Sequence, residues 1–368
     1  MARIVYSLSG EGRGHATRAH TVISLLGRQH DVLVYAPGMA HDLLSQCQYD
    51  PQRITLRRLD GLRFRYRGRR LSYLSSLVAS SGFLMRLPAR LRTIRHEIRN
   101  WGATHVINDF EPLLSRVARS SRLPLISLDH QHFLAAMDTN VLPSSLARKV
   151  RFLRLSIPLF CPRPDRQIIS SYFDFPVRPS MSHQVTKVGP LLRNAVLRAK
   201  SESGEHLVAY FRRDLPKQLL KSLQRCGKQV YVYGLGALSP TGNVQFLETS
   251  VDGFLEHLRS STALVCSSGN QLIGEALHWS KPILAVPEFG NFEQEINGFF
   301  LPTTGGGQTV QDSQVNPHTV GQFLENIDRY RNANGAVAAG NQVVIDRLNQ
   351  MILDHDSADQ QSVPSHAA

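Results

Sequence analysis

VCSSGNQLIGEALHWSKPILAVPEFGNFEQEINGFFL, residues Val265–Leu301, is the stretch that best reveals the fold. The apolar run Ala263–Ser267, which leads into it, is typical of a buried parallel strand. A Ser-Gly turn and a helical pattern follow, and a second strand-like run spans Pro282–Pro287. In an open parallel sheet, ligands bind beyond the carboxyl ends of the strands, where loops lead into helices. The stretch therefore predicts a strand–helix–strand unit with a ligand site at that edge.

Three polar groups are expected at this edge of the sheet. The turn leaves the first backbone N–H groups of the helix free, and such a helix N-terminus suits a diphosphate. A carboxylate one to two turns further along can accept hydrogen bonds from both hydroxyls of a ribose. Each residue alone is more typical of a surface position or a helix cap, but their order and spacing together indicate a nucleotide site. The three groups are the turn Ser268, Gly269 and Asn270, the carboxylate of Glu275, and the pair Glu293 and Gln294 after the second strand.

The rest of the chain alternates short β-rich runs with helical patterns. In the first half, the expected strands are Ile4–Ser9, Asp31–Ala36, His105–Asp109, Leu125–Asp129 and Gln167–Ser170. In the second half, they are Leu207–Phe211, Gln229–Tyr233, Ala263–Ser267 and Pro282–Pro287. This alternation predicts an α/β protein of two doubly wound domains with parallel sheets. We expect one domain at 1–190, a second at 191–353, and a polar, disordered tail at 354–368.

A second informative stretch, SLSGEGRGHATRAH, spans Ser7–His20 and places a glycine-rich bend before a helical pattern. Gly10, Gly12 and Gly14 let the backbone turn tightly and approach a ligand or the other domain. The spacing GxGxG differs from the dinucleotide pattern GxGxxG, and no acidic residue ends the next strand. These two features argue against a nicotinamide or flavin cofactor. His15 opens the helix at the cleft, where it either accepts a proton from a hydroxyl or caps the turn.

Two polar stretches follow strands of the first domain. They are NDFEP, at Asn108–Pro112, and LDHQHF, at Leu128–Phe133. Because both strands end at the same edge of the sheet, the two stretches face the same cleft. Asp109 is therefore in a position to orient His15 as a carboxylate–imidazole pair.

A metal site competes with this interpretation. Residues two apart on a strand point the same way, so Asp109 with Glu111, and His130 with His132, have ligand-like spacing. No third or fourth ligand follows from the spacing, so neither a metal nor a cofactor is expected. Asp129, His130 and His132 are instead candidates for acceptor binding, or for hydrogen bonds that join loops of the two domains.

Composition limits the cellular setting. The chain is 42% apolar, yet no apolar run approaches the roughly 18 residues that a membrane span needs. The first residues do not have the pattern of a signal peptide. The four cysteines lack CxxC spacing, so they indicate neither a zinc site nor a disulfide framework. We therefore expect a protein of the reducing cytoplasm.

Positive charge is concentrated in the first half of the chain, where residues 1–200 carry 31 of the 42 Lys and Arg but 12 of the 29 Asp and Glu. The densest basic runs lie at 53–70, 86–99 and 147–160, and the last two are interleaved with apolar residues. No helix-turn-helix, zinc finger or RNA-binding aromatic motif accompanies them, so nucleic acid is the weaker interpretation. Basic residues mixed with apolar ones suit an anionic membrane surface. For a cytoplasmic protein, this would be the inner face of the membrane.

The motifs SSGNQLIGEAL and FEQ, with the bend GEGRGHATRA, together resemble the nucleotide-sugar signature of GT-B glycosyltransferases. They are similar to the peptidoglycan N-acetylglucosaminyltransferase that makes lipid II and to UDP-glycosyltransferases. The narrower resemblance is to a bacterial and archaeal glycosyltransferase-like group, some of whose members carry teichoic-acid labels. The likeness in pattern extends over most of Met1–Leu353. It implies two Rossmann-like domains that face each other across a cleft.

The resemblance also implies roles for matching residues. His15, in the bend with its three glycines, matches the histidine that is taken as the base for the acceptor hydroxyl. Glu275 matches the glutamate that binds the ribose. Ser268 and Gly269 match the turn that meets the phosphates of the donor.

Two positions depart from the pattern of the relatives. Glu293 and Gln294 stand where relatives have Asp-Gln or Gln-Gln to hold the hydroxyls of the donor sugar. After the strand Leu207–Phe211, relatives often have a Gly/Ser loop, whereas this chain reads FRRDLP. Arg212 and Arg213 are expected to neutralise the diphosphate or to face solvent.

We therefore expect a hexosyltransferase that moves a sugar from a UDP-linked donor to a hydroxyl of a lipid-linked or cell-envelope polysaccharide acceptor. The nearest relatives imply an inverting, metal-independent reaction. Two alternatives stay open at this point. One is a UDP-GlcNAc 2-epimerase, with Asp109, Glu111 and Asp129 as acid and base groups. The other is a non-catalytic binder of nucleotide sugars or nucleic acid.

Overall fold

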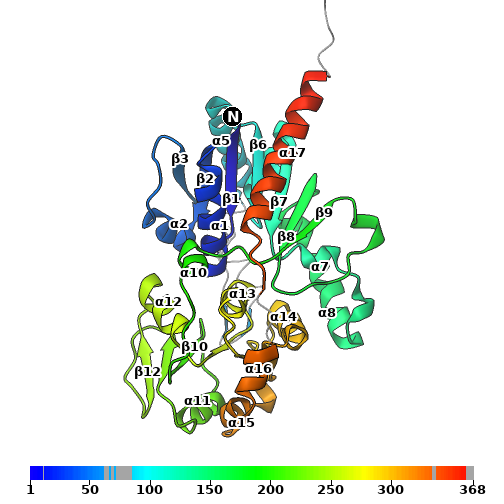
Figure 1. Ribbon diagram of the computed structural model, residues 1–368. Helices are drawn as coiled ribbons and strands as arrows, with labels where there is room; N and C mark the ends of the chain where they lie inside the picture. The colour runs from blue at the N-terminus through cyan, green and yellow to red at the C-terminus, as the bar shows by residue number, and fades with distance from the viewer. Residues whose placement is uncertain (11, 62–65, 68–69, 72–84, 334–336, 362–368) are drawn as a thin grey trace, which may run out of the picture.

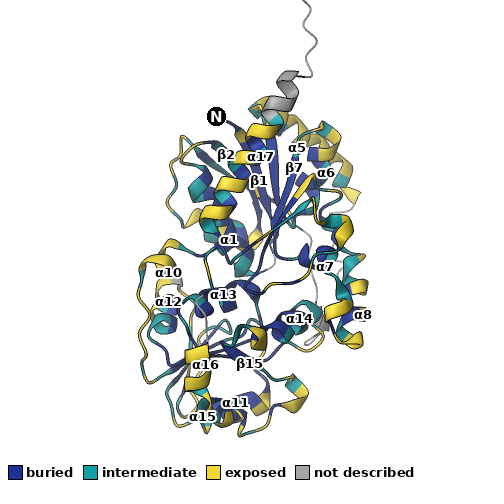
Figure 2. Ribbon diagram, turned by 45° about the vertical axis from the view of Figure 1, so that its right-hand side comes forward, coloured by how far each residue is buried: buried dark blue, intermediate teal, exposed yellow. Residues whose placement is uncertain are grey.

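The computed structural model describes residues 1–10, 12–61, 66–67, 70–71, 85–333 and 337–361. It contains two α/β units, one above the other in Figure 1, each built on its own parallel sheet. The expectation of two doubly wound domains is thereby confirmed. Figure 2 shows the buried strands inside each unit and the exposed residues on the outer helices.

The first unit, within the described part of the chain, has a parallel sheet of seven strands in the order β3-β2-β1-β6-β7-β8-β9. The strands are β1 (Arg3–Leu8), β2 (Asp31–Pro37), β3 (Ile54–Leu59), β6 (His105–Asp109), β7 (Leu125–Asp129), β8 (Arg166–Ser170) and β9 (Val185–Val188). A separate antiparallel pair is formed by β4 (Tyr66–Arg67) and β5 (Arg70–Leu71). The helices are α1 (Arg13–Leu26), α2 (Gly38–Ser45), α5 (Leu87–Trp101), α6 (Pro112–Ser121), α7 (Phe133–Ala136), α8 (Ser144–Arg154) and α9 (Ile157–Phe160). Short 3-10 turns are η1 (Thr139–Val141) and η2 (Pro179–Met181).

The second unit, again among the described residues, has a parallel sheet of six strands in the order β12-β11-β10-β13-β14-β15. The strands are β10 (Leu207–Tyr210), β11 (Val230–Tyr233), β12 (Val244–Leu247), β13 (Ala263–Cys266), β14 (Ile283–Ala285) and β15 (Gly307–Thr309). The helices are α10 (Asn194–Arg198), α11 (Lys217–Gln224), α12 (Val251–Arg259), α13 (Asn270–His278), α14 (Phe292–Phe300), α15 (Thr319–Glu325) and α16 (Ile327–Ala333). The last helix, α17 (Asn341–Gln361), follows them in the chain but packs on the first unit. Short 3-10 turns are η3 (Leu301–Thr304) and η4 (Asp312–Gln314).

The strand order of each sheet brings the predicted site residues together. β1 lies between β2 and β6, and Leu8 at its end is paired with Asp109 at the end of β6. In the second sheet, β10 lies between β11 and β13, and Tyr210 is paired with Cys266. Connections leave these neighbouring strands in opposite directions, which opens a crevice at their carboxyl ends. Both motif-bearing turns, after β1 and after β13, therefore lie at such a point.

The interior strands were predicted, whereas several edge strands were not. β3, β9, β12 and β15 lie at or next to the borders of the two sheets. Edge strands are exposed on one side, so their sequences alternate with polar residues and lack an apolar run. The sequence VTKV of β9 and the sequence GQT of β15 illustrate this, since neither contains two consecutive apolar residues.

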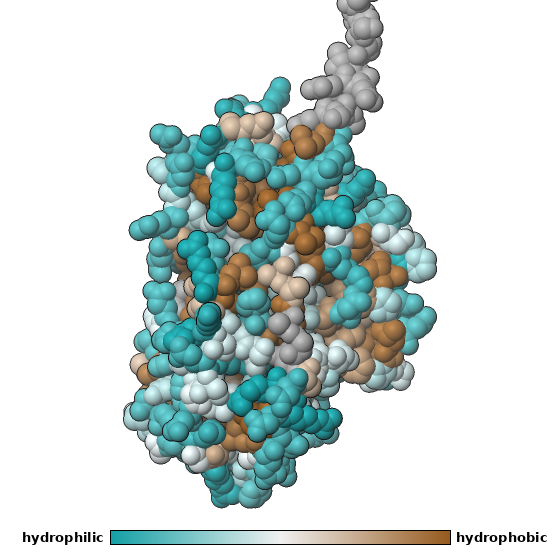
Figure 3. Space-filling model, viewed as in Figure 1, coloured by the Kyte–Doolittle hydropathy of each residue, from teal (hydrophilic) through white to brown (hydrophobic). Residues whose placement is uncertain are grey.

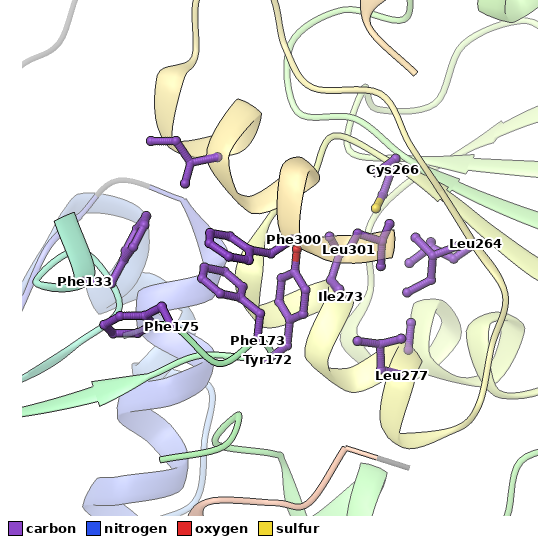
Figure 4. Close-up of a cluster of buried hydrophobic side chains, with 14 of the residues drawn as sticks. Phe133, Tyr172, Phe173, Phe175, Leu264, Cys266, Ile273, Leu277, Phe300 and Leu301 are labelled. Atoms are coloured by element: carbon purple, nitrogen blue, oxygen red, sulfur yellow. The ribbon is translucent and has the colours of Figure 1, made fainter. Parts of the chain in front are cut away.

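The two units share an apolar interface, shown in Figure 4. Phe133, Tyr172 and Phe173 come from the first unit, and Ile273 and Phe300 come from the second. The rings of Phe173 and Phe300 stack with centroids 4.3 Å apart and planes 4° apart. Burial of such large rings contributes several kcal/mol in total, about 1.5–3 kcal/mol for each fully buried side chain. The interface therefore holds the two units in a defined orientation.

The last helix returns to the first unit, as Figure 1 shows for α17. Its residues Val344, Leu348 and Ile352 are buried in the core that contains Ile4 and Val22. The spacing of four residues puts the three apolar side chains on one helix face. The predicted tail began at Asp354, but the helix continues to Gln361, while 362–368 lie outside the described residues. The chain therefore crosses between the units twice.

The basic runs of the first unit are only partly described. The run at 53–70 includes β3 and β4, but 62–65 and 68–69 lie outside the described residues. The apolar-basic run at 86–99 forms α5, which buries Ile94 and Ile98 and exposes arginines on its other face. The third run forms α8 and α9, beside the cavity described below.

Candidate functional site

A cavity of about 640 Å³, here called the cleft cavity, lies between the two units. Its wall is built by the start of α1, the turns after β7 and β13, the start of α14 and the linker at 189–193 between β9 and α10. Predicted residues in the wall are Gly12, Gly14, His15, His130, Arg212, Gly269, Asn270, Glu275, Glu293 and Gln294. Other predicted residues lie behind the wall, namely Gly10, Asp109, Asp129, His132 and Ser268.

His15 lies in the cavity wall and is bonded to Asp109. Its Nδ1 is 2.7 Å from Asp109 Oδ1, and both side chains are buried. Because a carboxylate only accepts, Nδ1 carries the proton of this bond, and Nε2 keeps its lone pair. Among the residues that the structure describes, none forms a hydrogen bond with Nε2. The bond to Asp109 therefore fixes the ring in the cavity wall and leaves Nε2 as the nitrogen that can accept a proton.

A third residue, Arg18, completes this arrangement and was not predicted from the sequence. Its Nε donates to Asp109 Oδ2 at 3.0 Å, and its Nη2 donates to Oδ1 at 2.5 Å. Nη2 also lies 3.1 Å from His15 Nδ1. Burial disfavours the charged guanidinium, but the ion pair with Asp109 outweighs this and raises the pKa of Arg18. The signal for Arg18 was present, since residues three apart on a helix share a face.

The glycine bend allows the two units to approach each other. Gly12 has φ +80° and ψ 164°, and a Cβ at this position would lie 2.1 Å from Nη1 of Arg212. Arg212 comes from the second unit, so the bend meets the other domain, as the glycine pattern predicted. Gly10 serves packing within the first unit instead, because its Cβ would lie 2.9 Å from Pro37.

The turn before α13 exposes backbone rather than the predicted serine side chain. Ser268 has φ +61° and is fully buried, and its carbonyl oxygen accepts from Asn297 Nδ2 at 3.1 Å. Ser267 and Gly269 line the cavity in its place. Gly269 is the N-cap of α13, and no side chain caps this helix end. Backbone N–H groups at the start of α13 are thus available to an anion.

Asn270 uses its side chain to join the units. Its Oδ1 accepts from the backbone N of Tyr172 at 3.2 Å, and its Nδ2 donates to the carbonyl oxygen of Ser170 at 3.2 Å. Both partners belong to the chain that leaves β8 of the first unit. Only the remaining surface of Asn270 is available to a ligand in the cleft cavity.

Glu275 lies in the cavity wall, but it is already paired. Arg193 of the linker donates to it twice, from Nε to Oε1 at 2.9 Å and from Nη2 to Oε2 at 2.5 Å. Gln271 Nε2 lies 3.3 Å from Oε1. The sequence did not predict Arg193, because the two partners are 82 residues apart. A carboxylate has about four acceptor positions, so one position on Oε2 remains.

Glu293 and Gln294 begin α14 and line the cavity from the second unit. Gln131 Nε2 of the first unit lies 3.3 Å from Glu293 Oε1. Gln294 Oε1 accepts from the backbone N of Glu288 at 2.8 Å, which turns the amide Nε2 toward other partners. The pair therefore offers carboxylate acceptors and amide donors, the groups that bind sugar hydroxyls.

Asp129 and His132 form a buried pair behind the cavity. Asp129 Oδ2 accepts from His132 Nδ1 at 2.6 Å, and Oδ1 accepts from the backbone N of His132 at 2.8 Å. Burial would raise the pKa of Asp129, but His132 more than compensates and lowers it to about 2. These contacts stabilise the turn after β7, so neither side chain is placed to meet an acceptor.

His130 connects the two units. Its Nδ1 is 3.0 Å from the carbonyl oxygen of Ser170, and its Nε2 is 2.9 Å from Oδ1 of Asn297 on α14. Burial lowers the pKa of His130, although the charge of Glu293 opposes this. Of the two roles left open by the sequence, the geometry favours the bonding of interdomain loops.

The pairs with ligand-like spacing do not converge. Glu111 caps α6, with its two carboxylate oxygens 2.8 and 2.7 Å from the backbone N of Leu113 and Leu114. Burial raises the pKa of Glu111 to about 7, although these two bonds lower it. No three His, Cys, Asp or Glu side chains within the described ranges gather closely enough to hold a metal ion. Nor do the three carboxylates considered for an epimerase lie in the cavity wall.

Three arginines act on one tyrosine of the cavity wall. Burial and the charge of Glu288 raise the pKa of Tyr210, while the charges of Arg13, Arg212 and Arg193 lower it. The tyrosine, the three arginines and Glu288 all line the cleft cavity. Two of the arginines come from opposite units, and the third comes from the linker. A polyanion would be attracted to this point from the solvent.

Three comparisons relate the chain to known proteins. The model of glycosyl transferase family 1 matches residues 2–328. Among curated proteins, no sequence matches. Similar solved structures include Os79 from O. sativa in complex with U2F and trichothecene, at 11% identity and TM-score 0.67 over 95% of this chain and 100% of that chain. Arabidopsis thaliana UGT89C1 complexed with UDP matches at 11% identity and TM-score 0.67 over 96% and 100%. Acinetobacter baumannii MurG matches at 15% identity and TM-score 0.58 over 95% and 100%.

The structural likeness covers nearly the whole of each chain, so both units and their relative placement share the fold of these glycosyltransferases. The family model covers most of the sequence as well. The chain belongs to glycosyl transferase family 1 and is a glycosyltransferase with the GT-B fold.

Proposed function

We propose that the cleft cavity transfers a hexosyl group from a UDP-linked sugar to an acceptor hydroxyl, with His15 as the general base. The observation that carries this proposal is the 2.7 Å contact between His15 Nδ1 and Asp109 Oδ1, which leaves Nε2 of this cavity-lining ring without a hydrogen-bond partner among the described residues. The start of α13 lies close by, since a Cβ on Gly14 would be 3.5 Å from Cβ of Gln271. The proposed base and the proposed anion site would therefore lie close to each other in one cavity. Similar structures have been solved with UDP, which supports uridine as the nucleoside of the donor.

In the proposed reaction, the acceptor oxygen attacks the anomeric carbon from the face opposite the diphosphate. The new C–O bond forms, the bond to the UDP oxygen breaks, and the acceptor proton passes to His15 Nε2. This single displacement inverts the anomeric configuration. The N–H groups at the start of α13 and the guanidinium of Arg212 stabilise the charge that develops on UDP. These groups take the place of a divalent metal, so we propose that the activity survives chelation.

The donor would lie along the second unit. The diphosphate meets the turn at Ser267 and Gly269, and Glu293 and Gln294 receive the sugar hydroxyls. Glu275 takes the ribose, but Arg193 and Gln271 together leave it only one free acceptor position. The ribose therefore binds Glu275 through a single hydrogen bond, or it displaces part of this network.

We propose further that the acceptor carries a lipid and is met at an anionic membrane surface. Phe110, Leu134, Leu153, Ile157 and Phe160 form an apolar part of the cavity wall beside α8 and α9. Just outside it, Phe152, Leu155 and Leu159 are 57%, 76% and 61% exposed. Figure 3 shows apolar side chains gathered over α8 on the right-hand side of the molecule. Exposed Arg148 and Arg151 accompany them.

A patch that joins apolar and basic groups suits the surface of an anionic bilayer, where each basic residue contributes about 1 kcal/mol. No described helix is both long and apolar enough to cross a membrane. Attachment would therefore depend on this patch, here called the α8–α9 patch, which consists of Arg148, Arg151, Phe152, Leu155 and Leu159.

The substitution His15→Asn tests the catalytic proposal. General base catalysis contributes roughly 10²–10⁴-fold, so UDP release from UDP-glucose, UDP-galactose or UDP-GlcNAc should fall by about this factor. The affinity for UDP, measured by calorimetry, should stay within about twofold, since the base contacts the acceptor. His20→Asn is the matched control, because His20 lies on the same helix and in the same cavity. Unchanged turnover in His15→Asn, or epimerisation of UDP-GlcNAc without an acceptor, would contradict the proposal.

Co-sedimentation with vesicles tests the membrane proposal. Vesicles that contain phosphatidylglycerol should bind the protein at low salt and release it at high salt. Serine at Phe152, Leu155 and Leu159 should weaken this binding at least tenfold. Serine at Met39, which is 52% exposed elsewhere on the first unit, should leave it unchanged. Equal binding to neutral and anionic vesicles, or none at low salt, would exclude an anionic membrane surface.

A further inference from the structure

The environment of His15 contains a buried positive charge whose role the proposed reaction does not specify. Arg18 is 3% exposed and Asp109 is 0% exposed, and two hydrogen bonds join them. Asp109 Oδ1 is shared, since it accepts from His15 Nδ1 at 2.7 Å and from Arg18 Nη2 at 2.5 Å. The two donors are themselves 3.1 Å apart. A carboxylate–imidazole pair alone would lack the guanidinium that lies beside both partners here.

We infer that Arg18 is a positioning residue that keeps the His15–Asp109 pair free of an extra proton at neutral pH, so that His15 is ready to act as a base. This inference rests on the proposed function, because it assumes that His15 accepts the acceptor proton. Arg18 acts through Asp109 and His15 and contacts neither reacting atom. Its effect has two physical parts, the orientation of Asp109 and the charge that it places beside the imidazole.

The charge part follows from counting the groups. Arg18 carries +1 and ionised Asp109 carries −1, so the trio is neutral when the imidazole is neutral. Protonation of His15 would place two cations 3.1 Å apart in a site that excludes most water. The buried carboxylate, for its part, keeps its charge because Arg18 pairs with it on both oxygens. Both effects oppose an extra proton on the pair.

Other charges around α1 do not substitute for Arg18. Asp129, at the end of β7, is paired with His132, and Glu275 on α13 is paired with Arg193. Burial raises the pKa of Tyr6 on β1 well above its usual value, so this phenol stays neutral. Ionisable groups that interact electrostatically with Arg18 or Asp109 include Tyr6, Asp129 and His130.

Removal of Arg18 should raise the pH at which the pair takes up a proton, whichever of the two side chains binds that proton. Without the guanidinium, the buried pair can become imidazolium with carboxylate, or imidazole with carboxylic acid. In both forms the pair has gained one proton, and it gains it at a higher pH than in the native protein. A neighbouring charge at this range shifts such an equilibrium by about 1–3 pH units. The native pair therefore takes up its proton at lower pH than a pair without Arg18.

The test uses NMR of the full chain with ¹⁵N-labelled histidine. The signals of His15 are those that disappear in the His15→Asn spectrum, and they can be followed against pH without any substrate. In Arg18→Met and Arg18→Gln, we expect the midpoint of the His15 titration to rise by about one pH unit or more. In Arg18→Lys, which keeps the charge, the midpoint should stay close to that of the native protein. The acid limb of the pH–rate profile should move in the same way.

The two neutral variants guard against a fold failure, because Gln keeps an N–H donor for Asp109 while Met does not. Equal midpoints in the native protein and in a folded neutral variant would overturn the inference. So would a shift in Arg18→Lys as large as the shift in Arg18→Met. Failure of the proposed function would be seen in a different measurement. If His15 is not the base, His15→Asn would retain turnover, whatever the effect of the Arg18 substitutions on the titration of His15.

Discussion

The substitution Gly12→Ala adds a single methyl group and tests how closely the two units approach each other. Its backbone, at φ +80° and ψ 164°, lies in a region that is essentially restricted to glycine. Alanine in that region costs about 1–3 kcal/mol. The methyl group would also lie 2.1 Å from Nη1 of Arg212, at the far end of a flexible side chain. The guanidinium can swing away at little cost, so the backbone strain dominates the loss of stability.

The same displacement should reduce the affinity for a nucleoside diphosphate. If Arg212 contacts the diphosphate, Gly12→Ala removes a hydrogen bond to a charged group, which is worth about 1.5–3 kcal/mol. This corresponds to a loss of roughly ten- to a hundredfold in the affinity for UDP. The variant should therefore be both less stable and weaker in binding.

Gly14→Ala is the matched control for this substitution. Gly14 lies two residues further on, inside α1, and its Cβ would make an ordinary contact of 3.5 Å with Cβ of Gln271. Alanine is favoured over glycine in a helix by up to about 1 kcal/mol, so this variant should be at least as stable as the native protein. Urea unfolding midpoints and UDP calorimetry on the three proteins make the comparison. A Gly12→Ala variant with native midpoint and native affinity would refute both the strain argument and the position of Arg212.

Two further predictions concern buried polar groups. Asp129 has a folded pKa of about 2, below its unfolded value, so its ion pair stabilises the fold above pH 4, and this contribution is lost as pH falls from 4 to 2. Asp129→Asn should remove about 2 kcal/mol of this pH dependence, and an unchanged slope of the urea midpoint against pH would contradict the pairing. Asn297→Ala should cost about 2 kcal/mol or more, because His130 Nε2 and the carbonyl oxygen of Ser268 lose their partner inside the interface. The exposed Asn326→Ala, its control, should change the unfolding midpoint little, and equal effects of the two would argue against a bonded interface.

The sequence predicted those parts of the fold that are buried on both faces. β1, β6, β10 and β13 occupy the interior of the sheets, and their apolar runs reflect this. Edge strands such as β15 are short and polar, so their pairing depends on the neighbouring strand rather than on their own sequence. The last helix could not be assigned to the first unit either, because its apolar face does not specify which core it covers.

In the candidate site too, some contacts could be predicted from the sequence and others could not. The pairing of His15 with Asp109 follows from two neighbouring strands whose ends coincide, so a strand order predicts it. Asn270 illustrates the opposite case. Its side-chain partners lie 98 and 100 residues away, across the domain interface. Such a contact depends on how the two units are oriented, and no local pattern records that orientation.

Glu275 shows why the position of a matching residue does not by itself fix its chemistry. The linker beside it is bonded to both units, since Gln271 donates to the carbonyl oxygen of Leu191 at 2.8 Å and Asn341 donates to that of Leu192 at 2.8 Å. Arg193, the next residue of this linker, donates twice to Glu275. A ribose at this position would therefore meet a carboxylate that is already engaged, and its affinity would depend on how much of the Arg193 contact it can replace.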